Sequence, residues 1–76
     1  MLIAILPPVE NIDFAAICRR VRKYIRYTQQ EMADFLCVSK PTYVNWETGK
    51  NVPSGNIAVW LYNTGKELEK ELSLEK

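Results

Sequence analysis

The side chains that follow residue 39 have the most distinctive spacing of reactive groups in this sequence. If residues 40–48 form a helix with about 100° per residue, one side carries two aromatic rings and an acid. The other side has no large apolar residue and no acid, and it consists of Lys40, Pro41, Val44, Asn45 and Thr48. An amide that donates and accepts, a lysine and a hydroxyl are groups that bind a polar or anionic partner.

Groups for catalysis are scarce. The sequence has no histidine, which removes the commonest general base and every histidine metal ligand. Cys18 and Cys37 lie too far apart for a C-x-x-C pair. Two thiols without a secretory signal fit a reducing cytosol, so we interpret them as packing residues. We therefore expect no enzyme, no metal site and no cofactor.

The length of the chain limits how these groups can be positioned. A chain of 76 residues supports one small core, because a domain of this size buries only about 60% of the surface of its unfolded chain. The apolar run 1–6 stops at Pro7-Pro8, and it is far shorter than the roughly 20 residues of a membrane span. We expect a single soluble domain over residues 1–76, in the cytoplasm and without a membrane partner.

Apolar spacing of 3, 4 and 7 residues predicts a first helix that starts at Phe14, with Asp13 as its N-cap. Its predicted apolar side is Phe14, Ile17, Cys18, Val21, Tyr24 and Ile25, and Arg22 lies at the border of this stripe. The opposite side carries Arg19, Lys23 and Arg26, which together with Arg20 we interpret as a solvated face. Of these, Arg26 is the one we place nearest to a bound polyanion.

Two short helices with a three-residue turn follow. Thr28-Gln-Gln-Glu31 is a capping box that starts a helix over residues 29–36. Ser39 as a cap, Pro41 in the first turn and Gly49 after the end predict the next helix over residues 40–48. Ala33 is the small residue at the crossing, and we expect the inner face to consist of Met32, Leu36, Val38, Tyr43 and Trp46. Phe35 is also expected on the buried side of the first of these two helices. These are the dimensions of a helix-turn-helix.

The end of the chain allows two interpretations. Asn63-Thr64-Gly65 reads as a stop, and Thr64 to Glu67 is a second capping box that would start a separate C-terminal helix over 63–76. One unbroken helix is the alternative. We favour the break, which gives an all-α fold of four to five short helices, with a helix-turn-helix core over 13–62 and an N-terminal arm or short strand over 1–12.

The formal charge of +1 hides an uneven distribution. Residues 1–13 sum to −2, residues 14–53 to +4 and residues 54–76 to −1. The middle of the chain can therefore meet a polyanion, although a basic helical face is often only a solvated surface.

The stretch from Thr28 to Lys50, with Pro53, resembles the phage Cro/repressor-type (Xre) helix-turn-helix family. The Thr-Gln-x-x-x-Ala opening, the Val-Ser turn and the Trp-Glu-x-Gly-Lys ending all occur in register, and the likeness covers about residues 14–62. The resemblance implies a lambda-repressor-like fold whose third helix enters the DNA major groove. It also implies that Arg22 pairs with Glu47, the glutamate after the tryptophan.

The resemblance and the exposed face together give a set of DNA-binding residues. Asn45 is the candidate for adenine, Lys40 for guanine or a phosphate, and Thr28 and Gln29 for a phosphate at a helix N-terminus. For each of them a cap or a solvated surface residue is the alternative. The full predicted set is Thr28, Gln29, Ser39, Lys40, Pro41, Thr42, Val44, Asn45, Thr48 and Lys50, with Arg22 and Glu47 as a structural pair.

Two residues depart from the family pattern. Cys37 stands where the family usually has glycine, a position that often needs φ > 0, so either the turn differs or the chain accepts about 1 kcal/mol of strain. Pro41 removes a polar side chain at a position that often reads a base, which leaves apolar contact with a thymine methyl or no readout there.

These observations favour a small homodimeric transcriptional regulator, a repressor of the phage or mobile-element kind, that binds a palindromic double-stranded DNA operator in a bacterial or phage-infected cell, associated with the nucleoid. Trp60 and the apolar Leu2, Ile3, Ile5 and Leu6 suggest a dimer contact. Two alternatives remain: an antitoxin that represses its own promoter and binds a toxin or another regulator, and a protein-interaction module of the same fold without DNA binding.

Overall fold

The computed structural model describes residues 12–74, and for residues 71–74 it describes the backbone alone. This part of the chain forms four helices: α1 (Phe14–Ile25), α2 (Gln29–Leu36), α3 (Lys40–Thr48) and α4 (Gly55–Leu74). The predicted all-α fold is confirmed. The predicted N-terminal arm or strand lies, except for Ile12, outside the described residues.

The first three helices begin at the predicted caps. Asp13 accepts a hydrogen bond from the Ala16 amide at 3.1 Å, and Thr28 and Glu31 form the reciprocal capping box at 3.1 and 2.8 Å. Ser39 caps α3. Gly49 ends α3 in the left-handed region, with φ of 84°, a conformation that glycine adopts without a steric penalty. Local sequence therefore sets the boundaries of α2 and α3.

The core lies where α1 packs against α3 and α4, and α2 closes it against α3. Val21, Met32, Ala33 and Leu61 are inaccessible to solvent. Tyr43 and Trp46 pack edge to face with ring centroids 6.2 Å apart, which confirms their predicted place in the core rather than on a binding surface.

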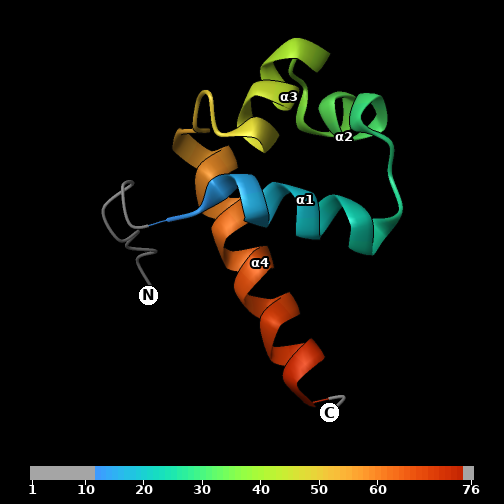
Figure 1. The fold of residues 1–76 in the computed structure, drawn as a ribbon, viewed down its shortest axis with the longest axis vertical. Helices are drawn as coiled ribbons and strands as arrows, with labels where there is room; N and C mark the ends of the chain where they lie inside the picture. Colours follow the sequence, from blue (N-terminus) through green and yellow to red (C-terminus); the bar gives the residue numbers. More distant parts are fainter. Residues whose placement is uncertain (1–11, 75–76) are drawn as a thin grey trace.

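Three large apolar residues predicted to be buried are exposed instead. Tyr24 and Ile25 are exposed because the last turn of α1 extends away from α4 (Figure 1). Phe35 is 52% exposed, and its ring turns outward to lie 5.5 Å from the ring of Trp60. The prediction that both cysteines pack inside holds for Cys18 and is wrong for Cys37, which is exposed.

The predicted break near residue 64 is wrong, because α4 is continuous from Gly55 to Leu74. Gly65 is buried, and a Cβ there would lie 3.0 Å from Cγ2 of Ile17. The glycine therefore permits a close approach of α1 to α4 and does not end a helix. Thr64, the predicted cap, lies inside the helix.

The continuous α4 gives the molecule two distinct ends. The α2 and α3 helices lie at one end, and the C-terminal half of α4 projects from the other (Figure 1). No helix within residues 12–74 is long and apolar enough to cross a membrane.

Candidate nucleic-acid interface

The turn between α2 and α3 consists of residues 37–39. Cys37 has φ of 62° and ψ of 40°, so it occupies the left-handed conformation for which glycine is preferred. The Val38 amide donates to the Ala33 carbonyl at 3.0 Å, which closes the end of α2. The turn thus keeps the helix-turn-helix geometry. The backbone at Cys37 is strained, because the Cβ atom is crowded in this conformation.

The outward face of α3 contains the residues that the sequence grouped there. Lys40, Pro41 and Thr48 are exposed, and Val44 and Asn45 are partly buried. Beyond the end of the helix, Lys50 is also exposed. The structure therefore brings these six residues to one end of the molecule.

Local hydrogen bonds fix several hydroxyl groups on this face. The Ser39 hydroxyl donates to Oγ1 of Thr42 at 2.9 Å. The Thr48 hydroxyl donates to the Asn45 carbonyl at 3.2 Å, and that carbonyl also accepts from the Asn51 amide at 3.2 Å. These bonds hold the backbone of Asn45 in place through its carbonyl and do not use its side-chain amide.

Pro41 costs α3 no hydrogen bond. It is the second residue of the helix, and the first four amides of an α-helix have no partner within the helix. The effect of Pro41 is therefore confined to the exposed face, where an apolar ring replaces a polar side chain.

Glu47 is the only acidic residue of α3 and points away from the outward face. It is 4% exposed, and its carboxylate receives two hydrogen bonds from Arg22 of α1, at 2.5 and 3.3 Å. This confirms the predicted pair. Tyr43 of α3 donates to the same carboxylate, and so does Gln29 of α2 at 3.0 Å.

These contacts determine the charge state of the cluster. Burial alone raises the pKa of Glu47, but hydrogen bonds from Arg22, Tyr43 and Gln29 outweigh it and hold that pKa below its ordinary value. Burial and the bond to Glu47 raise the pKa of the Tyr43 hydroxyl. The bond to Glu47 likewise raises the pKa of Arg22. A charged carboxylate and guanidinium with a neutral phenol therefore connect three helices.

Arg19 has a structural role that sequence reasoning missed. Its guanidinium donates to the carbonyl oxygen of Glu47, one of the last four carbonyls of α3, which have no partner within the helix. Spacing offered a signal, because Arg19 and Arg22 are three residues apart on one side of α1. Arg20 also differs from the solvated face that we expected, because it pairs with Glu69 of α4 at 3.2 Å.

The N-terminus of α2 combines capping with the predicted phosphate site. The oxygen of the Thr28 hydroxyl accepts from the Glu31 amide, which leaves its hydrogen to donate. Gln29 directs its side-chain amide to Glu47, a contact that the sequence did not predict, and a primary amide carries a second hydrogen. Arg26, predicted to be the basic residue of α1 nearest DNA, is exposed at the end of α1 with φ of 63°.

Comparison with known proteins gives one finding. A family model described as helix-turn-helix matches residues 19–59, more than half of the chain. A search of the curated proteins and of the solved structures gave no match. The matched region contains α2, the turn and α3 together with Arg22 and Glu47. The chain belongs to the Cro/repressor-type helix-turn-helix family and has the fold of a DNA-binding regulator.

Proposed function

We propose that this protein is a homodimeric repressor of the phage or mobile-element kind that reads a palindromic operator with α3 in the major groove. One observation carries the proposal: the single acid of α3 is withdrawn into a neutralising cluster. The outward face of the helix then presents lysine, amide and hydroxyl groups without a negative charge, which suits a polyanionic ligand.

We assign the base contacts to α3. The amide of Asn45 is suited to adenine, with which it can form two hydrogen bonds. Lys40 at the start of the helix reaches guanine or a phosphate, and Val44 and Pro41 offer apolar contact to a thymine methyl. Thr28 and the second amide hydrogen of Gln29 bind a phosphate at the N-terminus of α2. Ser39, Thr42, Thr48 and Lys50 contact the DNA backbone.

A dimer follows from the few base pairs that one module reads. Two copies of α3 on a two-fold operator need half-sites about 34 Å apart. Phe35 and Trp60 are 52% and 39% exposed, and they border a shallow depression with Leu36, Asn56 and Ile57. Because aromatic side chains are enriched in protein interfaces, we assign this surface to the second copy.

Selection of binding sites from random DNA duplexes tests the proposal. Enrichment of a palindrome is the expected result, and the two half-sites give the spacing of the α3 helices. Asn45→Ala and Lys40→Ala should each weaken binding to the selected site by about 5- to 150-fold, the equivalent of 1–3 kcal/mol per specific contact. Lys70→Ala, at the far end of α4, is the control and should bind like the parent. Equal affinity of all variants would show that the outward face of α3 does not read DNA.

The exposed aromatic pair also supports the second candidate, a regulator that binds a toxin or another protein. In that case Trp60→Lys abolishes binding of the partner and leaves the parent's oligomeric state unchanged. In the homodimer, the same variant is monomeric in sedimentation and loses affinity for the palindrome while it keeps weak binding to one half-site.

A further inference from the structure

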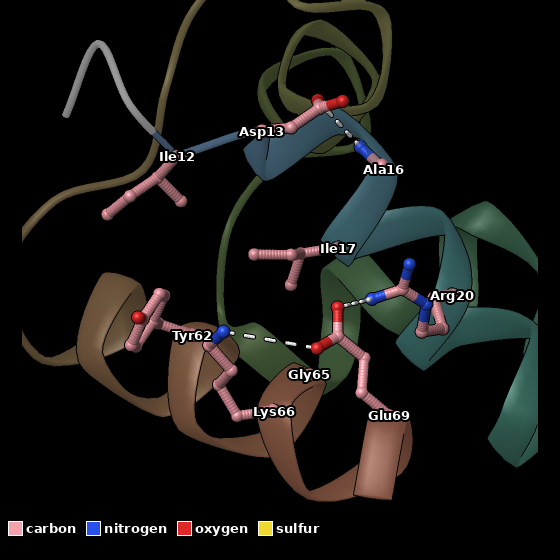
Figure 2. Close-up of a pocket in the computed structure, with 9 residues that line it drawn as sticks. All are labelled: Ile12, Asp13, Ala16, Ile17, Arg20, Tyr62, Gly65, Lys66 and Glu69. Carbon is pink, nitrogen blue, oxygen red and sulfur yellow. Dashed lines mark hydrogen bonds and ion pairs between the residues drawn. The ribbon is translucent and has the colours of Figure 1, made fainter. Parts of the chain in front are cut away.

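A groove of about 300 Å³ separates α1 from α4, and none of the residues that line it comes from α2 or α3. Ile12, Ile17 and Tyr62 surround the open space, and Arg20 of α1 with Lys66 and Glu69 of α4 forms a charged border (Figure 2). The groove therefore has an apolar floor and a charged border, and it is separate from the surface that we assign to DNA.

The packing of α1 on α4 keeps this groove open. The two helices approach closely at Gly65, where Ile17 fills the space that a Cβ would take. The groove lies between that contact and Ile12, which packs against the core just before the cap of α1. Further closure would press Ile17 into α4, so the two helices cannot close the groove by approaching each other.

We propose that the apolar N-terminal segment of the same chain, residues 1–9, occupies this groove. Leu2, Ile3, Ile5, Leu6 and Val9 supply apolar side chains, and Glu10 is the only charged side chain before Ile12. Pro7 and Pro8 have no amide hydrogen, so two fewer donors need partners on the apolar floor of the groove.

The length of the segment fits the groove. Leu6 is six residues from Ile12 and can extend up to about 20 Å from it, at 3.3–3.6 Å per residue. The groove follows α4 from Tyr62 to Glu69, a rise of about 10 Å at 1.5 Å per residue. The segment can therefore run the whole length of the trough and still remain joined to Ile12, which already lies in it.

Attachment at Ile12 favours the segment of the same chain over that of a second copy. A short tether gives an effective concentration in the millimolar range, far above the concentration at which a second copy would compete in a dilute solution. The segment then covers its own apolar residues, and it leaves α3 and the Phe35–Trp60 surface accessible. This inference does not depend on the proposed DNA binding.

A nitroxide label on the full chain tests the location of the segment. Ala4→Cys places the label between the apolar residues, and Cys37→Ala removes the exposed thiol. Cys18 does not react, because it is buried and its thiol pKa is raised to about 12. We expect the amide signals of Ile17, Gly65 and Lys66 in the nuclear magnetic resonance spectrum to lose most of their intensity and to recover it when the nitroxide is reduced. The signals of Phe35 and Val44 should keep theirs.

Three further samples make the result decisive. In Ala16→Leu the longer side chain fills the groove, and broadening at Gly65 should be lost. Ala15→Leu is the matched control, because Ala15 is the neighbouring residue of α1 and does not line the groove, and broadening should persist. Mixing labelled chains without nitrogen-15 and unlabelled chains with nitrogen-15 should give no broadening. Broadening in that mixture, broadening at Phe35 or Val44, or none at Gly65 in the parent would overturn the proposal.

Discussion

Glu47 determines how α3 is held, because its carboxylate accepts hydrogen bonds from α1, from α2 and from α3 itself. Its backbone carbonyl accepts a further bond from Arg19. A carboxylate that is 4% exposed is stable only with such partners. The residue therefore fixes the angle of α3 and also keeps the negative charge off the outward face.

Replacing Glu47 by Gln should lower the free energy of unfolding by about 3 kcal/mol. The substitution leaves the guanidinium of Arg22 without a counter-charge, and breaking a buried pair from one side costs about 3–5 kcal/mol. We take the lower end because the side chain of Arg22 is 19% exposed. Urea unfolding measures the change. Glu67→Gln is the matched control and should stay within about 0.5 kcal/mol, because Glu67 is 70% exposed. Equal losses in both variants would contradict the role of the cluster.

Acid should remove the difference between the parent and Glu47→Gln. Hydrogen bonds hold the folded-state pKa of Glu47 below its ordinary value of 4.5, so its contribution to stability is fully present above pH 4.5. That contribution is lost as the pH falls through the folded-state pKa. Unfolding of both proteins at several pH values should give a constant difference near neutrality and a smaller one in acid. A difference independent of pH would show that the charge of Glu47 is not what stabilises the fold.

Sequence reasoning identified part of this cluster and missed the rest for a physical reason. Arg22 and Glu47 followed from the motif register, and Tyr43 from the apolar side of the helix. Gln29 and Arg19 were assigned to a phosphate and to solvent, because each also lies on a polar face where both roles are open. Only the relative placement of α1, α2 and α3 decides which polar side chain reaches the carboxylate.

At the scale of helices, the turn after α2 combines a required backbone conformation with an unfavourable residue. Cys37 has φ of 62°, where a side chain with a Cβ is strained by roughly 1–2 kcal/mol. Glycine relieves this strain but adds up to about 1 kcal/mol of chain entropy to the unfolded state. The net effect of glycine at position 37 is the strain that it relieves in the folded state minus the chain entropy that it adds to the unfolded state.

Cys37→Gly should therefore raise the free energy of unfolding by about 0.5–1 kcal/mol. Thermal or urea unfolding measures it. Cys37→Ala keeps the Cβ and removes the thiol, so it should leave stability within about 0.5 kcal/mol of the parent. If alanine stabilises the protein as much as glycine does, the thiol and not the backbone conformation is the cause.

The α4 helix shows why the local sequence predicted a helix break near residue 64 that the structure does not have. Asn63, Thr64 and Gly65 have the residue types of a helix stop followed by a cap. In the structure Gly65 lies inside a helix of 20 residues, and the missing Cβ leaves space for Ile17 of α1. That contact joins residues far apart in the sequence, so no local rule contains it. The boundaries of α2 and α3 were predictable because their caps are local.

At the scale of the whole molecule, the fold determines which lysine and arginine side chains remain available to a ligand. Arg22 and Arg20 are neutralised by Glu47 and Glu69 within the fold. Within residues 12–74, no ion pair or hydrogen bond holds the side chains of Lys23, Arg26, Lys40 and Lys50. Two of these lysines are on or just beyond α3. Only four of the seven lysine and arginine residues in 14–53 thus remain available to DNA, and the salt dependence of binding can count them.

If these four cations contact phosphates, the logarithm of the association constant should fall with the logarithm of salt concentration with a slope of about −3 to −4 per subunit, at about −0.9 per phosphate. Titrations of the selected operator over a range of salt concentrations measure the slope. Lys40→Ala should reduce its magnitude by about 1 if Lys40 binds a phosphate, and it should instead relax the sequence preference at one position if Lys40 reads a base. Lys70→Ala, on the projecting end of α4, should change neither. An affinity for DNA that does not vary with salt would exclude the phosphate contacts and favour the protein-interaction role of the same fold.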